Sequence, residues 1–406
     1  MAGILLFTAE APCYNVQKRA GGAGLESVRW IENKLRAEKF TPVTAEDALA
    51  ALEFWCSAPF YEPSPLTQLH LAPATLGLGE VFIKDEGRRF GPGSFKLLGA
   101  GYAMSRALLG EGRMSWPAAA ASPRRTVFFT ATDGNHGRAV AWLARRLGQR
   151  AAVLMPSGST RARYEAIAAE GASVTVEDAN YDECVRRAAL LAEEQGGILL
   201  QDTTLPGYEQ LPHEIMRGYG ALIAEAVQQL GAPPTHVILQ AGVGSFAGAA
   251  CSALCELYPD ADITFMVAEA AAAPCLMLSA AASKTRTVGG ELNTIMAGLA
   301  CGEPCSLGLR SLECRARFFA ALPDSWAADA MRALAREGVT AGESGAAGYG
   351  LLRAAMLSPG LEPLRAAAGL NEHSRVLLFN TETATDPDNY REIVRNFAGH
   401  NSSNGI

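Results

Sequence analysis

One lysine of this chain lies where its amine could do covalent chemistry. Lys96 stands in the segment GPGSFKLLGA, residues 91–100, between a glycine-rich turn and an apolar run, and the strand-like run VFIKD (81–85) precedes it. Burial in an apolar wall disfavours the charged ammonium, so the pKa of Lys96 is expected to fall. A neutral lysine amine attacks aldehydes and forms a Schiff base. Taken alone, the motif is more typical of a surface lysine at a helix start.

Two later segments each combine a strand-like run, a polar glycine turn and a helical pattern. The first reads TATDGNHG over residues 130–137, and the second reads GVGSFAG over residues 242–248. Glycines let the backbone approach an anion closely, and a helix N-terminus favours negative charge by about 0.3–1 kcal/mol. The second loop is therefore a candidate phosphate site. Its candidate residues are Gly242, Val243, Gly244, Ser245 and Gly248.

The lysine, the asparagine-containing loop and the glycine loop, in this order, resemble pyridoxal-phosphate enzymes of the tryptophan synthase β and threonine dehydratase fold type. Within that fold type the chain is similar to the diaminopropionate ammonia-lyase family. The segments that carry the likeness span roughly residues 80–390. They read KDEGRRFG (84–91), SFKLLG (94–99), ATDGNHGR (131–138), QDT (201–203), AGLACGEP (297–304), GESG (342–345) and NTETATDP (380–387).

The resemblance implies pyridoxal 5'-phosphate as the cofactor and gives several residues roles toward it. Lys96 would hold the aldehyde in the resting state, Asn135 would donate to the phenolate oxygen, and Thr381 would bond the pyridine nitrogen. Glu343 is also implied as a cofactor-binding residue. A hydroxyl cannot keep that nitrogen protonated as a carboxylate would, so the ring is a weaker electron sink and β-elimination is favoured over transamination. The alternative for Asn135 is a turn residue that holds its own loop, and the alternative for Thr381 is a turn hydroxyl at a strand end.

Two carboxylates narrow the range of substrates that the chain is expected to bind. The wider superfamily commonly has Ser-Gly-Asn in the asparagine loop, whereas this chain has Asp133 ahead of Gly134 and Asn135. Asp133 could accept the α-proton or pair with an ammonium on the substrate β-carbon, and the resemblance places Asp202 at the same site as a second catalytic acid. Two acids suit the dication 2,3-diaminopropionate better than serine. The alternatives are local: an Asx-turn at Asp133 and a strand-end cap at Asp202.

The implied reaction is α,β-elimination of D- and L-2,3-diaminopropionate to pyruvate and two ammonia. Lys96 and Asp133 are expected on opposite faces of the substrate, so that each removes the α-proton of one isomer. The alternative is a serine/threonine dehydratase-type ammonia-lyase acting on D-serine or a related β-substituted amino acid. A nicotinamide-linked enzyme is less favoured because the third glycine of the loop lies one position late for the dinucleotide-binding pattern. A catalytically inactive binding protein would not need Lys96, Asp133 and Asp202 together.

Strand-like and helical patterns alternate along most of the chain, which predicts an α/β protein. The resemblance sharpens this to two parallel-sheet domains with helices on both faces and the cofactor in the cleft between them. The large domain is expected to comprise residues 1–99 and 213–406, and the small domain residues 100–212. Ligands in such sheets bind at the carboxyl ends of strands, and all three cofactor segments follow strand-like runs.

Composition fits a cytoplasmic enzyme, and the resemblance implies a small amino-acid substrate. The chain has 406 residues, a net charge of −7 and nine cysteines without framework or zinc-like spacing. Its charge argues against nucleic acid or an acidic membrane as a partner, and no apolar run approaches the ~20 residues of a membrane span. No metal site is expected, because the cysteines and histidines lack the spacing of metal ligands. The protein is expected to form a homodimer. Cys275 and Cys301 flank segments that the resemblance places near the site entrance. The sequence therefore leaves two alternatives for this pair, a labile disulfide or two free thiols.

Two positions differ from the usual pattern of the family. Thr383 follows Asn-Thr-Glu where the family usually has glycine, and Ala100 also stands where glycine is usual. A β-branched residue is costly where the backbone needs a positive φ. Either difference is expected to alter the substrate or lower the rate.

Overall fold

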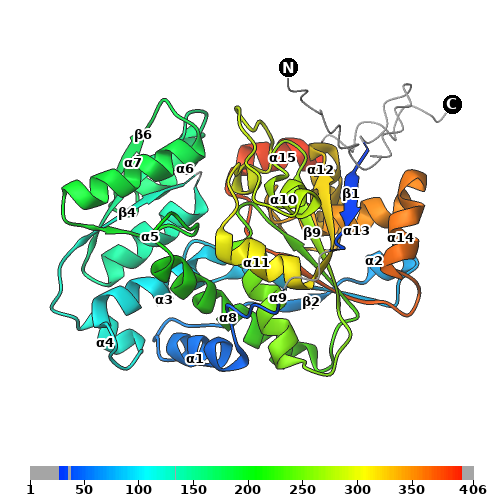
Figure 1. The fold of residues 1–406 in the computed structure, drawn as a ribbon, viewed down its shortest axis with the longest axis horizontal. Coiled ribbons are helices and arrows are strands. Elements are labelled where there is room, and N and C mark those ends of the chain that lie inside the picture. The colour runs from blue at the N-terminus through cyan, green and yellow to red at the C-terminus, as the bar shows by residue number, and fades with distance from the viewer. Residues whose placement is uncertain (1–26, 35–37, 133, 396–406) are drawn as a thin grey trace, which may run out of the picture.

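The strands of this chain form two separate sheets. The structure is a computed structural model that describes residues 27–34, 38–132 and 134–395. A seven-stranded sheet has the order β1-β10-β9-β8-β11-β3-β2, and a four-stranded sheet has the order β6-β5-β4-β7. We call the seven-stranded sheet with its helices the large unit and the four-stranded sheet with its helices the small unit. The large unit lies on the right of Figure 1 and the small unit on the left. The predicted domain boundaries fall inside α3 (Lys96–Leu109) and α8 (Gln210–Leu230), the helices that join the units.

The large sheet is parallel in its interior and antiparallel at its edges. The inner strands β10, β9, β8, β11 and β3 pair in parallel, which confirms the predicted parallel sheet, whereas β1 pairs antiparallel with β10 and β2 antiparallel with β3. The connection from β2 to β3 holds only the six-residue helix α2 (Leu71–Leu76), and it is short enough to reverse the chain beside its neighbour. The strands are β1 Arg29–Glu32, β2 Leu66–Gln68, β3 Glu80–Asp85, β8 His236–Gln240, β9 Thr264–Ala270, β10 Ala316–Leu322 and β11 Arg375–Asn380.

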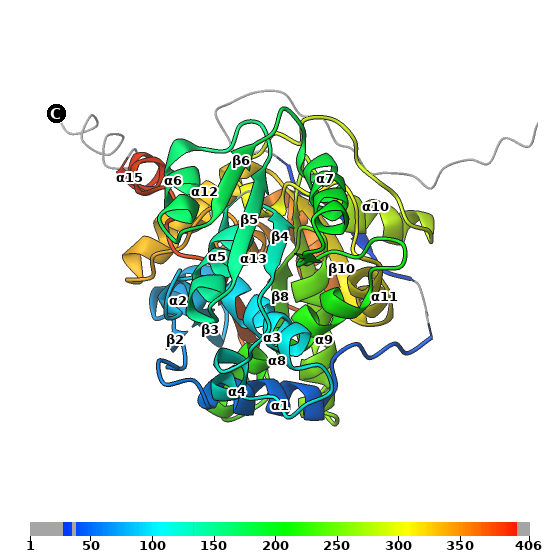
Figure 2. The same ribbon diagram turned by 90° about the vertical axis from the view of Figure 1, so that its left-hand side faces the viewer.

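The small sheet is entirely parallel and comes from one continuous stretch of chain. Its strands are β4 Val127–Ala131, β5 Arg150–Met155, β6 Ser173–Val176 and β7 Ile198–Leu199. Figure 2 shows α5 (Asn135–Arg146) and α6 (Arg161–Ala168) on one side of this sheet and α7 (Tyr181–Glu194) on the other. Each connection between its strands therefore crosses over through a helix, as parallel neighbours require.

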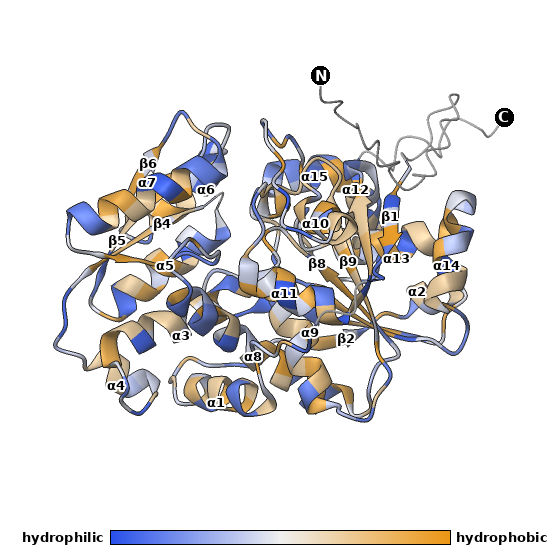
Figure 3. Ribbon diagram, in the orientation of Figure 1, coloured by the Kyte–Doolittle hydropathy of each residue, from blue (hydrophilic) through white to orange (hydrophobic). Residues whose placement is uncertain are grey.

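Helices cover both faces of the large sheet, so its strands are apolar on both sides. In β8, Val237 and Leu239 belong to one buried cluster while Ile238 belongs to the other. This alternation explains the continuous apolar runs in the sequence, and Figure 3 shows hydrophobic strands between helices with hydrophilic outer faces. The remaining helices are α1 Ala45–Cys56, α4 Trp116–Ala120, α9 Ser245–Leu257, α10 Cys275–Ala282, α11 Ser306–Arg315, α12 Asp324–Arg336, α13 Ala347–Leu357, α14 Glu362–Ala368 and α15 Pro387–Arg395, with short 3-10 turns η1 Glu86–Arg88, η2 Ala297–Leu299 and η3 Pro359–Leu361.

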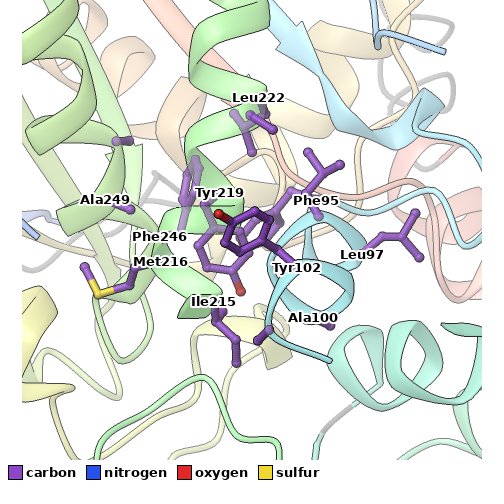
Figure 4. Packing of buried hydrophobic residues seen from close by; sticks show 14 of the residues in the cluster. Phe95, Leu97, Ala100, Tyr102, Ile215, Met216, Tyr219, Leu222, Phe246 and Ala249 are labelled. Carbon is purple, nitrogen blue, oxygen red and sulfur yellow. The ribbon is translucent and has the colours of Figure 1, made fainter. Parts of the chain in front are cut away.

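The junction of α3, α8 and α9 fixes the position of the lysine (Figure 4). The ring of Phe95 lies 4.9 Å from that of Tyr219 and 4.6 Å from that of Phe246, measured between centroids. A Cβ atom on Gly99 would lie 2.4 Å from Cε1 of Tyr219, so glycine is needed for α3 and α8 to approach this closely. Lys96 begins α3 directly after Phe95 and is therefore held between the two units.

Candidate active site

A pocket of about 720 Å³ lies between the two units, at the carboxyl ends of their strands. Residues that follow β4, β5, β6 and β7 form one side of its wall, and residues that follow β8 and β11 form the other. Gly248 and Glu343 lie outside the wall, and Asp133 lies outside the described residues. The wall includes most residues singled out from the sequence: Lys96, Asn135, Asp202, Gly242, Val243, Gly244, Ser245 and Thr381.

Lys96 forms an ion pair with Asp202 inside this pocket. Its Nζ donates to Oδ2 of Asp202, whose side chain is only 4% exposed. Burial disfavours the ammonium, but the Asp202 carboxylate outweighs burial and raises the pKa of Lys96 above its usual range. The expected fall of this pKa is therefore wrong, because the carboxylate that holds the proton comes from a distant part of the chain. For Asp202, burial favours the neutral acid, but the charge of Lys96 prevails and lowers the pKa to about 2.

The glycine loop after β8 has the geometry of an anion site. Gly244 has φ +94°, a conformation that favours glycine, and α9 begins at the next residue. A Cβ on Gly242 would lie 3.0 Å from Sγ of Cys301, so the loop is also too tightly packed for a side chain. The backbone N–H groups of the first turn of α9 have no partner within the helix and point toward a ligand at its N-terminus. These features fit the phosphate of pyridoxal phosphate.

Two of the predicted phosphate residues have other contacts. Ser245 Oγ donates to the backbone oxygen of Asp202 at 2.5 Å, so this hydroxyl joins the loop to the small unit. Gly248 lies one turn into α9, and a Cβ there would be 2.8 Å from Cα of Gly308. That glycine allows α9 and α11 to pack together.

Thr381 lies at the end of β11, and its hydroxyl is directed by a buried glutamine. Gln240 Nε2 donates to Thr381 Oγ1 at 3.0 Å and to the backbone oxygen of Phe379 at 2.8 Å. A hydroxyl that accepts from an amide retains its own hydrogen for another acceptor. Thr381 can therefore donate toward the pocket, which fits the predicted bond to a pyridine nitrogen.

Asn135 and Glu382 connect the two units across the pocket. Asn135 begins α5, and its Nδ2 donates to Oε2 of Glu382, whose Oε1 accepts from the backbone N–H of Ser344 at 3.0 Å. Sequence reasoning did not single out Glu382, although its position beside Thr381 at a strand end could have indicated it. Glu343 instead accepts from Nδ2 of Asn389 at 2.5 Å, so it faces α15, and its neighbour Ser344 lines the pocket.

Two further wall residues, His136 and Tyr181, reinforce the side formed by the small unit. His136 is buried, and its Nε2 lies 2.9 Å from the backbone oxygen of Leu200, which indicates a structural role. Tyr181 begins α7, and its hydroxyl contacts Gln201 and Asp202. No local motif marks Tyr181, because its contacts depend on how α7 packs.

The structure also bears on the thiols, on metal binding and on Thr383. Cys275 and Cys301 are buried free thiols. In the described part of the chain, no group of His, Cys, Asp and Glu side chains could hold a metal ion. Among described residues only Ser283 and Leu292 combine a side chain with positive φ. Thr383 therefore replaces glycine without that strain, and its N–H donates to the backbone oxygen of Gly93 at 3.0 Å.

Comparisons with known proteins agree with this geometry. Residues 58–380 match the family model described as pyridoxal-phosphate dependent enzyme. Diaminopropionate ammonia-lyase of Escherichia coli K12 is 38% identical over 378 residues, which cover 89% of this chain and 95% of the relative. The Salmonella typhimurium LT2 enzyme of the same name is 41% identical over 367 residues, covering 85% and 91%.

Solved structures show the same likeness. The crystal structure of the E. coli enzyme in complex with the aminoacrylate-PLP azomethine reaction intermediate has a TM-score of 0.85 and 37% sequence identity, covering 92% of this chain and 98% of that chain. The processed form of threonine deaminase isoform 2 from Solanum lycopersicum has a TM-score of 0.68 at 20% identity, which shows the shared fold.

Fold, pocket and matches together define a pyridoxal-phosphate dependent enzyme of fold type II, with this cofactor and carbon-nitrogen lyase chemistry. Within that class, the chain belongs to the diaminopropionate ammonia-lyase family. None of the helices in residues 27–34, 38–132 and 134–395 is long and apolar enough to span a membrane.

Proposed function

We propose that this protein eliminates ammonia from D- and L-2,3-diaminopropionate, and that the released 2-aminoacrylate hydrolyses to pyruvate and a second ammonia. The observation that carries the proposal is the Lys96–Asp202 pair beside the glycine loop. A buried carboxylate there matches the second ammonium of this substrate, because an opposite charge within hydrogen-bonding distance stabilises it. Relatives at 38% and 41% identity carry the name of this activity.

Each residue of the wall has a distinct task in this proposal. Bound pyridoxal phosphate supplies an electron sink that acidifies the α-proton of an amino acid attached to it. The glycine loop would hold its phosphate, and Asn135 and Thr381 would orient its ring. Lys96 would hold the aldehyde and then, as a free amine, remove the α-proton of the L-isomer.

The two acids would manage the remaining protons. Asp202, released from Lys96, would pair with the β-ammonium and keep this group protonated until it leaves as ammonia. Asp133 would remove the α-proton of the D-isomer from the opposite face. General base catalysis of this kind typically contributes about 10²–10⁴-fold.

The second candidate function is elimination from D-serine or a related β-substituted amino acid. The observation that favours it is a solved E. coli relative in complex with D-serine, with a TM-score of 0.86 and 36% identity. A substrate panel separates the two functions through kcat/KM for pyruvate formation. We expect both isomers of diaminopropionate to exceed D-serine, and a preference for D-serine would contradict the first proposal.

We also propose a cytoplasmic homodimer whose small domain spans residues 100–212. The free thiols of the described cysteines support a reducing compartment. Light scattering of the purified protein tests the oligomeric state, and a monomer would contradict it.

A further inference from the structure

The phenol of Tyr181 approaches the carboxylate that pairs with Lys96. Its hydroxyl oxygen lies 3.4 Å from Oδ1 of Asp202 and 2.7 Å from Nε2 of Gln201. The tyrosine begins α7 in the small unit, yet it packs against a cluster in the large unit formed by Val243, Cys301 and Cys305. It therefore reaches Asp202 from a neighbouring connection of the small unit while its ring packs against the large unit.

The hydrogen bonds of Gln201 fix the direction of donation. Gln201 is fully buried, and its Oε1 accepts from the backbone N–H of Ala131 at 2.9 Å. Its Nε2 therefore donates, to the backbone oxygen of Ala131 at 3.1 Å and to Tyr181 at 2.7 Å. Since the phenol oxygen accepts from an amide, its own hydrogen is available for the Asp202 carboxylate.

We propose that Tyr181 is a positioning residue, which donates to Oδ1 of Asp202 and holds this side chain as an oriented carboxylate when Lys96 is engaged elsewhere. In the described structure, Oδ2 of Asp202 is held by Lys96. A bond from Lys96 to the cofactor would change that pair. A buried carboxylate that loses its cation tends to take up a proton. A donor that stays in place on the other oxygen opposes this, because hydrogen bonds to an anion favour the ionised form.

Other titratable groups lie near Asp202, but their polar atoms have contacts that differ from those of the Tyr181 hydroxyl. Lys96 of α3 and His136 of α5 both favour the anion, and His136 Nε2 is engaged by Leu200. Tyr208 donates to the backbone oxygen of Leu199, whereas the hydroxyl of Tyr219 of α8 is buried with no hydrogen-bond partner in the described part of the chain.

Only the kinetic test of this proposal depends on the proposed function, because it uses diaminopropionate as the substrate. In the holoenzyme with Tyr181→Phe, the acidic limb of kcat/KM for diaminopropionate should move to higher pH by about one unit. The acid-side change in visible absorption of the bound cofactor, recorded without substrate, should move in the same direction. If diaminopropionate is not a substrate, the absorption test still reports on Tyr181 and Asp202.

Tyr208→Phe is the matched control, because it removes a buried hydroxyl bound to the backbone of Gln201 while leaving the donor to Asp202 in place. We expect it to leave both pH curves unchanged. Curves that do not move in Tyr181→Phe, or that move equally in both variants, would overturn the proposal. Replacing Tyr181 with 3-fluorotyrosine guards against a folding defect: this more acidic phenol should move both curves to lower pH, and no movement would also overturn it.

Discussion

Replacing Asp202 with asparagine should destabilise the protein by an amount that depends on pH. Asp202→Asn keeps the size of the side chain but removes the charge opposite Lys96. The pKa of Asp202 falls from its usual 3.8 to about 2, which corresponds to about 2 kcal/mol of stability at neutral pH. Removing one partner of a fully buried pair costs about 3–5 kcal/mol. Because the Lys96 side chain is 20% exposed, we expect a loss near the lower figure, about 2–3 kcal/mol.

The sign of the pH dependence is part of the prediction. A depressed carboxyl pKa stabilises the folded state fully above the unfolded value near 4, and this contribution disappears as the pH falls through about 2. Urea unfolding of the cofactor-free protein should show the full difference between wild type and Asp202→Asn at pH 7. The difference should shrink below pH 4.

The control is Asp262→Asn, which removes a carboxylate from an exposed position. Its free energy of unfolding should stay within about 0.5 kcal/mol of that of the wild type. Turnover of diaminopropionate by Asp202→Asn should fall by about 10²–10⁴-fold. Wild-type stability at pH 7 together with wild-type turnover would refute the reasoning, since the ion pair would then carry neither role.

Three further predictions concern the cofactor and the two isomers. Asp133→Asn should lower turnover of D-diaminopropionate by about 10²–10⁴-fold and that of the L-isomer much less, as measured by pyruvate formation; equal losses would make Asp133 a binding or structural residue. Thr381→Asp should protonate the ring nitrogen and increase transamination relative to elimination, measured as pyridoxamine phosphate against pyruvate, and an unchanged ratio would contradict the electronic argument. The purified protein should be yellow, and borohydride should fix the cofactor onto the peptide that contains Lys96 in mass spectrometry; a cofactor fixed elsewhere would displace Lys96 from its role.

The features that could be predicted from the sequence share a local cause. Lys96, the asparagine loop and the glycine loop each follow a strand, and the carboxyl ends of parallel strands meet at one edge of a sheet. Their convergence in one pocket follows from that rule once the strands are placed. Likewise, the alternation of strands and helices was sufficient to predict parallel sheets, apart from the antiparallel edge strands β1 and β2, whereas the division into two domains was implied by the family resemblance.

The features that could not be predicted depend on contacts between distant segments. Asp202 lies 106 residues from Lys96, and Glu382 lies 247 residues from Asn135. The first contact reverses the expected direction of the lysine pKa, and the second joins the two units through a residue that no motif marked. The orientation of Glu343 toward α15 also follows from packing, because its neighbour Ser344 occupies the position on the wall.

The ratio of ammonia to pyruvate tests the central claim most directly. Purified protein with pyridoxal phosphate is incubated separately with D- and L-2,3-diaminopropionate, and both products are quantified over the same time course. The proposed elimination predicts two ammonia for each pyruvate with either isomer. No pyruvate from either isomer, or one ammonia for each pyruvate, would contradict the proposed function.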